Sequence, residues 1–289
     1  MNLFPRPSKL RVFLTLGRVS NLPTVWSDCL AAWWLGGGGN VWTLVCVSIS
    51  VSFLYEGGMF LNDAFDAAFD RHHRRTRPIP SGAIDEREVW QWGCIWLILG
   101  LAGVAWRGEV PLIFGLLLSA CIVIYNAIHK WTPFAPLVMG ACRLGVYLVA
   151  ASAASNGVDG EVIWKGLALA AYVAGLSWVA RKESARVEVN YWPCILLAAP
   201  IFIAGCIDDG DSAKPALLFS LVLAVWVLWA VSRSFGRGGA NVGYTVSRLL
   251  AGIALVDLLT VATVSDPWIA IFGAWFLLAL LLQRFIPAT

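Results

Sequence analysis

The chain has 289 residues, of which 59% are hydrophobic and 13% are charged, and its mean hydropathy is +0.73. This composition excludes a soluble domain with one buried core and is typical of a polytopic membrane protein. The net charge of +3 reflects the charge of the loops more than nucleic-acid binding, so we expect a lipid bilayer and no nucleic acid as partner.

Ten apolar runs are long enough to cross a hydrocarbon core about 30 Å thick. In chain order they are residues 22–36, 41–61, 89–106, 110–128, 135–154, 162–180, 191–207, 214–233, 244–264 and 267–286. We therefore expect an all-α bundle of about nine to ten transmembrane helices, formed by residues 1–289 as a single domain.

The basic residues predict the orientation of this bundle. Sixteen of the 21 Lys and Arg residues lie in the terminal segments and in every second loop, whereas the other loops are mainly acidic. Cytoplasmic loops of membrane proteins are enriched in Lys and Arg. We expect an integral membrane protein of the bacterial inner membrane, with both termini in the cytoplasm.

Four polar residues end the second predicted span, in the sequence NDAFDAAFD at 62–70. On a helix Asn62, Asp66 and Asp70 are each four residues apart, and Asp63 lies beside them on the same stripe. Like charges at this spacing repel each other unless a cation compensates them. Because carboxylate and carboxamide oxygens suit Mg²⁺, the stripe predicts a magnesium site.

A basic loop follows this stripe and contributes Arg71, Arg74, Arg75 and Arg77. Guanidinium groups bind phosphate oxygens in a bidentate manner, so carboxylates, metal and arginines together predict a diphosphate site. A simpler interpretation is that the arginines only mark a cytoplasmic loop and pair with the aspartates. It explains the arginines but explains less well why four metal-binding side chains are in register.

These residues also resemble a known family. NDAFDAAFD resembles the N-D-x-x-D-x-x-x-D motif of the UbiA superfamily of intramembrane prenyltransferases, and RPIPSG at 77–82 resembles the segment after it. RVSNLPTVW at 18–26 resembles the entry to the first helix, and YNAIHK resembles the family's Tyr and Lys, here Tyr125 and Lys130. The resemblance implies a central cavity, open to the cytoplasmic side, where an isoprenyl diphosphate binds through Mg²⁺.

The resemblance assigns roles to particular residues. The metal ligands are expected to be Asn62, Asp63, Asp66 and Asp70, and the catalytic group to be Asn62, Asp66, Asp70, Tyr125 and Lys130. Substrate binding is expected from Arg18, Asn21, Trp26, Arg71, Arg74, Arg77, Lys130, Trp178, Arg181 and Glu183. The two tryptophans are included because aromatic faces stabilise an allylic carbocation.

One region departs from the usual family pattern. Typical members carry a second aspartate-rich motif after the sixth span, whereas this chain reads LSWVARKESARVE at 176–188, without an aspartate. With MGACRLGVYLVAAS at 139–152, this region resembles the EboC-like branch. Either Glu183 with Arg181 and Lys182 binds diphosphate with fewer metal ions, which we favour, or ionisation is weakened and the protein has another role.

Two ionisable residues lie inside predicted spans, where such groups are functional candidates. Arg143 has Glu56 or Asp28 as an expected structural partner, and Asp257 has Arg248.

The function we expect is that of an Mg²⁺-dependent intramembrane prenyltransferase, which ionises an isoprenyl diphosphate and transfers the prenyl group to an unknown acceptor. One alternative is a terpene cyclase, in which a double bond of the substrate itself traps the carbocation. Another is a non-catalytic membrane component that binds or exports a hydrophobic cargo. The missing second motif favours the last alternative, and the intact first motif opposes it.

Overall fold

The computed structural model describes residues 8–185, 192–208, 210–233, 242–262 and 265–288, except for the side chains of 182–185, 192, 193, 211 and 242. All regular structure in these ranges is helical. The elements are α1 (Lys9–Leu16), η1 (Val19–Asn21), α2 (Leu22–Leu35), α3 (Val41–His73), α4 (Glu86–Ala105), α5 (Glu109–Ile128), α6 (Ala135–Ser152), α7 (Gly160–Ala185), η2 (Trp192–Ala198), α8 (Ala199–Ile207), α9 (Gly210–Ser232), α10 (Val242–Ala251), α11 (Ile253–Thr260) and α12 (Asp266–Leu282).

Seven helical segments in the described ranges are long and apolar enough to cross a membrane, which confirms an all-helical membrane protein. They are α3, α4, α5, α6, α7, α9 and the α10–α11 pair. The other predicted spans also fall on helices, but these are shorter. α2 has 14 residues, and the two remaining apolar segments are Cys194–Ile207 and Asp266–Leu282.

The length of α3 places its polar end at one boundary of the bundle. Its 33 residues extend for about 50 Å, well beyond a hydrocarbon core of about 30 Å. The helix begins at the side chain of Asn40, which accepts a hydrogen bond from Trp42 N, and ends where Arg74 N donates to Asp70 O at 2.8 Å. The stripe at 62–70 therefore occupies the last third of a helix that has already spanned the apolar layer.

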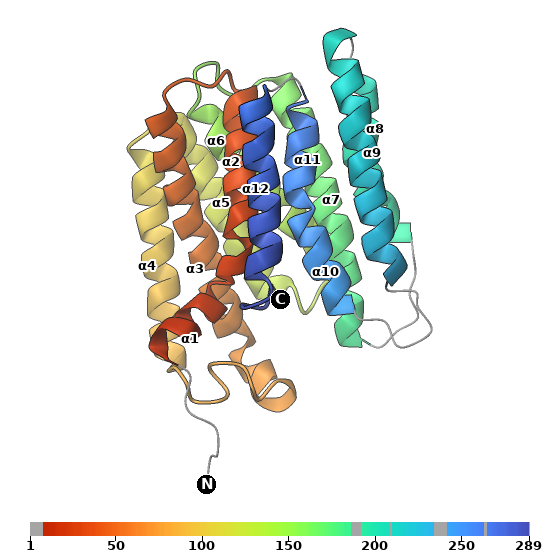
Figure 1. The fold of residues 1–289 in the computed structure, drawn as a ribbon. Helices are drawn as coiled ribbons and strands as arrows, with labels where there is room; N and C mark the ends of the chain where they lie inside the picture. The colour runs from red at the N-terminus through yellow and green to blue at the C-terminus, as the bar shows by residue number, and fades with distance from the viewer. Residues whose placement is uncertain (1–7, 186–191, 209, 234–241, 263–264, 289) are drawn as a thin grey trace.

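The other elements are arranged around α2. This helix contacts α3, α6, α11 and α12, while α4 pairs with α3, and α8 and α9 lie at one side of the bundle (Figure 1). Helix α1 and the C-terminal end of α12 lie at the end of the bundle that also carries the loop after α3 (Figure 1). The polar stripe, this loop and the α1–α2 connection are therefore at the same end.

The chain bends sharply between α1 and α2, and we call Gly17–Asn21 the elbow. Arg18 has a φ of 46°, a left-handed conformation that no other non-glycine residue in the described ranges adopts. A Cβ atom on Gly17 would lie 1.9 Å from Glu56 Oε2 of α3. The absence of a side chain at Gly17 therefore lets the elbow approach α3 closely.

A small apolar cluster fixes the loop after α3 against the same end of the bundle. Its buried members are Val12, Leu16, Phe60, Ala64, Ala67, Ile79, Ile84 and Val89, which come from α1, α3, the loop and α4. Because Ile79 and Ile84 lie on either side of the loop's turn, the basic segment before them is held above the stripe of α3.

Candidate active site

The polar stripe forms as its spacing predicts. Asn62, Asp63, Asp66 and Asp70 lie on one continuous helix, and none is more than 7% exposed. Buried carboxylates need a compensating charge or hydrogen bonds. The groups that compensate them come from three other parts of the chain.

The elbow supplies the first cation. Arg18 Nη2 donates to Asn62 Oδ1 at 3.0 Å and lies 3.6 Å from Asp63 Oδ1. The amide of Asn62 is held from its other side, because its Nδ2 donates to Asn126 Oδ1 at 3.0 Å. Asn126 in turn donates to Gly58 O at 3.0 Å. This chain of contacts directs the carbonyl oxygen of Asn62 toward Arg18.

The loop after α3 supplies the second cation. Arg77 Nη1 lies 2.7 Å from Asp63 Oδ1 and 3.5 Å from Asp70 Oδ2. Burial lowers the pKa of the Arg77 guanidinium, and Asp63 beside it acts in the opposite direction. Arg74 caps the helix through its backbone, and its charge lies close enough to act on Asp63 and Asp70. Both arginines are therefore brought to the stripe.

The end of α5 supplies two further groups. Lys130 Nζ lies 2.7 Å from Asp66 Oδ1 and 4.2 Å from the centre of the Phe69 ring. His129 Nε2 lies 3.2 Å from the same Asp66 oxygen. Its Nδ1 is 3.1 Å from Asn126 O, so both ring nitrogens face oxygen atoms.

His129 and Asn126 are site residues that the sequence did not identify. Both lie within YNAIHK, the segment in which the family resemblance indicated only Tyr125 and Lys130. Their helical spacing could have identified them. Residues three or four apart share one face of a helix, and Asn126 and His129 are three apart. Tyr125 stacks on His129 with ring centres 5.3 Å apart, so it contacts the stripe through that histidine.

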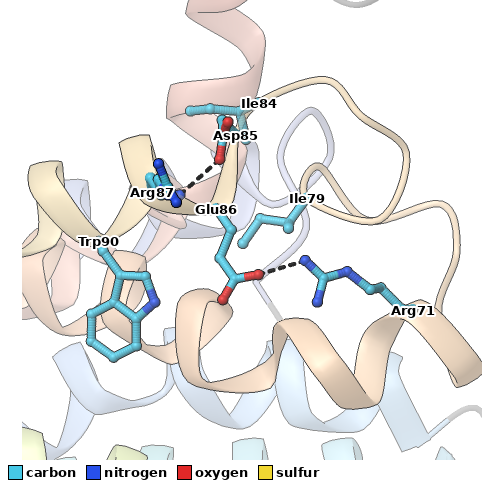
Figure 2. Close-up of a pocket in the computed structure, with 7 residues that line it drawn as sticks. All are labelled: Arg71, Ile79, Ile84, Asp85, Glu86, Arg87 and Trp90. Carbon is cyan, nitrogen blue, oxygen red and sulfur yellow. Dashed lines mark hydrogen bonds and ion pairs between the residues drawn. The ribbon is translucent and has the colours of Figure 1, made fainter.

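Arg71 points elsewhere. Its Nη2 lies 2.5 Å from Glu86 Oε2, and half of its side chain is exposed. Figure 2 shows the two side chains facing each other in a cavity of about 430 Å³, lined by Arg71, Ile79, Ile84, Asp85, Glu86, Arg87 and Trp90. None of the four stripe residues lines this cavity.

The remaining candidates lie around the site at varying distances. Arg181 of α7 donates to Thr132 O in the loop that follows Lys130. Asn21 Nδ2 donates to Ala288 O at 3.0 Å, and Trp26 Nε1 donates to Ser52 Oγ at 3.0 Å. Trp178 lies on α7, three residues before Arg181. The side chains of Lys182 and Glu183 lie outside the described part of the structure.

A second polar cluster lies deep in the bundle between α2, α6 and α11. Arg143 Nη1 pairs with Asp28 Oδ2, and its Nη2 donates to Thr24 Oγ1 at 3.2 Å. The expected pairing of Arg143 with Asp28 is therefore confirmed. Asp257 accepts from Tyr147 Oη at 2.6 Å and from Ser27 Oγ.

The expected pairing of Asp257 with Arg248 is wrong. The guanidinium carbon of Arg248 lies 4.6 Å from the centre of the Tyr244 ring in α10. A break in the helix between α10 and α11 separates the two residues, so their sequence spacing did not predict their directions.

The side chains of the stripe suit a magnesium site in which the cation is bound partly by the protein and partly by a ligand. Asp70 Oδ1 is buried without a hydrogen-bond partner among the described residues. In the same ranges no three His, Cys, Asp or Glu side chains lie close enough together to hold a metal unaided. Mg²⁺ commonly binds one or two carboxylates and completes its shell with phosphate oxygens and water. The side chains present fit that arrangement.

Comparison with known proteins gives a consistent result. Residues 20–272 match the UbiA prenyltransferase family. A 4-hydroxybenzoate octaprenyltransferase of Paracidovorax citrulli is 28% identical over 243 residues, which cover 81% of this chain and 79% of the relative.

Two solved structures share the fold. A UbiA homologue of Aeropyrum pernix K1 has a TM-score of 0.64 at 19% identity, covering 91% of this chain and 98% of its own. A homologue of Archaeoglobus fulgidus, solved with GPP and Mg²⁺, has a TM-score of 0.63 at 14% identity, covering 94% and 99%.

Proposed function

Because the chain belongs to the UbiA prenyltransferase family, we propose that it ionises an isoprenyl diphosphate and transfers the prenyl group to an acceptor inside the membrane. One observation carries this proposal. Four oxygen-bearing side chains end a membrane-spanning helix, and cations from the elbow, the following loop and the end of α5 converge on them. This combination of acidic and basic groups suits a metal-bound diphosphate.

Asn62, Asp63, Asp66 and Asp70 would hold Mg²⁺, the ion with which the Archaeoglobus fulgidus homologue was solved. When bound, Mg²⁺ neutralises the charge that develops on the leaving diphosphate. Arg18, Arg77 and Lys130 already lie within 2.7–3.6 Å of stripe oxygens. They are close enough to contact phosphate oxygens beside the same ligands and stabilise the leaving group.

We assign the remaining candidates to the edge of the same site. Arg74 lies near the acidic end of the stripe, and Arg71 would have to leave Glu86 to reach the diphosphate. Arg181 and Glu183 would hold the diphosphate on the side where other members carry a second acidic motif. Asn21 and Tyr125 would border the substrate, and Trp26 and Trp178 would line the prenyl chain and shield the carbocation from water.

The transfer is a substitution at the first carbon of the prenyl group. The bond between this carbon and the diphosphate oxygen breaks, and the diphosphate leaves with the electron pair. The acceptor then forms a new bond to the same carbon and loses a proton. The Paracidovorax citrulli relative is named for a 4-hydroxybenzoate acceptor, which makes phenolic acids the first acceptors to test.

The single domain of residues 1–289 would have ten spans, at the upper end of the nine to ten expected, when α2, η2–α8 and α12 are counted with the seven longer segments. Its central cavity would open to the cytoplasm at the end that carries the stripe. We place the protein in the bacterial inner membrane with both termini inside, because Lys and Arg are concentrated at that end.

Cysteine labelling tests this orientation. Arg75→Cys is placed in a background in which the exposed Cys94 and Cys206 are serine, and intact cells are treated with an impermeant maleimide. We expect no labelling until the cells are opened, since Arg75 belongs to the loop after α3. Labelling of intact cells at position 75 would place the whole site on the outer side.

An activity assay tests the proposed function. Purified protein is incubated with geranyl, farnesyl and geranylgeranyl diphosphates, with phenolic acceptors, and with either Mg²⁺ or EDTA. We expect inorganic diphosphate and a prenylated acceptor to form only with Mg²⁺. A prenyl product that forms equally well without any acceptor would indicate a cyclase. The absence of diphosphate release from every substrate would overturn the proposal.

A further inference from the structure

The left-handed backbone of Arg18 lies in the elbow that brings its guanidinium to the stripe. A residue with a side chain adopts this conformation only where its surroundings hold it there, and such residues concentrate at functional sites. The φ of 46° at Arg18 therefore raises the question of which contacts fix the elbow.

A chain of hydrogen bonds runs from the buried polar cluster to Arg18. Arg143 Nη2 donates to Thr24 Oγ1 at 3.2 Å, and Thr24 Oγ1 donates to Asn21 O at 2.8 Å. Asn21 N then donates to Arg18 O at 2.9 Å. The Thr24 hydroxyl thus joins the Arg143 guanidinium to the turn of η1, and Tyr55 Oη of α3 also donates to Arg18 O, at 3.5 Å.

The far end of this chain is anchored in three helices. Arg143 on α6 pairs with Asp28 on α2, and Ser27, which precedes Asp28 on α2, donates a hydrogen bond to Asp257 on α11. Asp257 also binds Tyr147 on α6. Arg143 is 8% exposed, and Asp28, Tyr147 and Asp257 are completely buried. Because Nη1 of Arg143 pairs with Asp28 and Nη2 donates to Thr24, the guanidinium is held in one orientation.

We propose that Arg143 is a positioning residue for the diphosphate site, acting through Thr24 and the elbow to hold Arg18 against Asn62 and Asp63. The inference rests on the proposed function, because Arg18 matters here as a ligand of the diphosphate. The ion pair and hydrogen bonds of Arg143 are with Asp28 and Thr24, and none is with a stripe residue. It fixes the start of α2, and the start of α2 fixes where the Arg18 guanidinium lies.

The test is a double-mutant cycle on ligand binding. The probe is geranyl S-thiolodiphosphate, which resists ionisation, and its dissociation constant is measured by calorimetry with Mg²⁺. We expect Thr24→Val, which keeps the shape but removes the hydroxyl, to weaken binding by about three- to ten-fold, the size of effect typical of one hydrogen bond. Thr24→Ser restores the hydroxyl and should bind like the wild type.

The cycle separates positioning from general damage. In an Arg18→Gln background, Thr24→Val should cause no further loss, because the guanidinium that it positions is already absent. A matched control is Thr43→Val near the start of α3. It removes a similar hydrogen bond, the one that Arg107 Nη2 donates to Thr43 Oγ1 at 2.9 Å. The control should leave binding unchanged, and the melting temperature of each variant shows whether it is folded.

If Thr24→Val prevents folding, Arg143→Lys replaces it, since Lys keeps a charge beside Asp28 but lacks the second arm that reaches Thr24. Equal losses of affinity in the wild-type and Arg18→Gln backgrounds would overturn the positioning role. Full affinity of both Thr24→Val and Arg143→Lys would overturn it as well. A wild-type protein that does not bind the probe would overturn the proposed function and the inference with it. Binding with additive losses would overturn the inference alone.

Discussion

Asp66→Asn is expected to lower kcat/KM by at least about 10²–10³-fold, the loss typical when one preorganised charge at a reacting centre is removed. The substitution keeps the shape of the side chain but removes the charge that faces Lys130 and His129 and would bind the metal. Release of inorganic diphosphate from an isoprenyl diphosphate at saturating Mg²⁺ measures the effect.

The fold should survive this change. The side chains of Lys130 and His129 are 28% and 17% exposed, so water can solvate them when Asp66 is neutral. Asp85→Asn is a matched control at the same end of the bundle, because Asp85 caps α4 and Asn caps a helix equally well. Unchanged turnover in Asp66→Asn would remove this residue from the metal site.

Arg143→Met is expected to destabilise the folded protein by about 3–5 kcal/mol, since removing one partner of a buried ion pair leaves the other charge uncompensated. The charge left without a partner is the carboxylate of Asp28, which is completely buried. The melting temperature in detergent, or the denaturant midpoint of a reversible transition, would measure the loss.

The paired variant Asp28→Leu/Arg143→Met should recover most of this stability, because apolar side chains of similar size often replace a buried ion pair without loss. Arg107→Met is the control, since Arg107 is exposed and its loss should change stability by no more than about 0.5 kcal/mol. If Arg143→Met were as stable as this control, the buried cluster would not hold the bundle together.

The sequence predicted the stripe well because its geometry is local. A continuous helix fixes the relative directions of residues 62, 63, 66 and 70, and α3 continues without a break to His73. The basic loop was also predicted, but the sequence could not separate Arg77, which reaches Asp63, from Arg71, which turns to Glu86. That choice depends on how the loop packs, through Ile79 and Ile84, against α1 and α4.

The parts that sequence could not predict depend on contacts between distant segments. Arg18 reaches Asn62 because of a left-handed residue in the elbow and a glycine beside it, neither of which follows from residue spacing. His129 reaches Asp66 because α5 packs beside α3. The break between α10 and α11 turned Asp257 toward Tyr147 instead of Arg248. Assignment to the EboC-like branch stays a prediction.

A structure of the protein with Mn²⁺ and geranyl S-thiolodiphosphate tests the central claim most directly. We expect Mn²⁺ to contact Asp66 and Asp70 together with oxygens of the diphosphate, and Arg18, Arg77 and Lys130 to contact the phosphate groups. A second metal ion bound directly by Glu183 would refute the replacement of that metal by basic side chains. A diphosphate bound away from α3, for example in the cavity beside Glu86 and Trp90, would contradict the account.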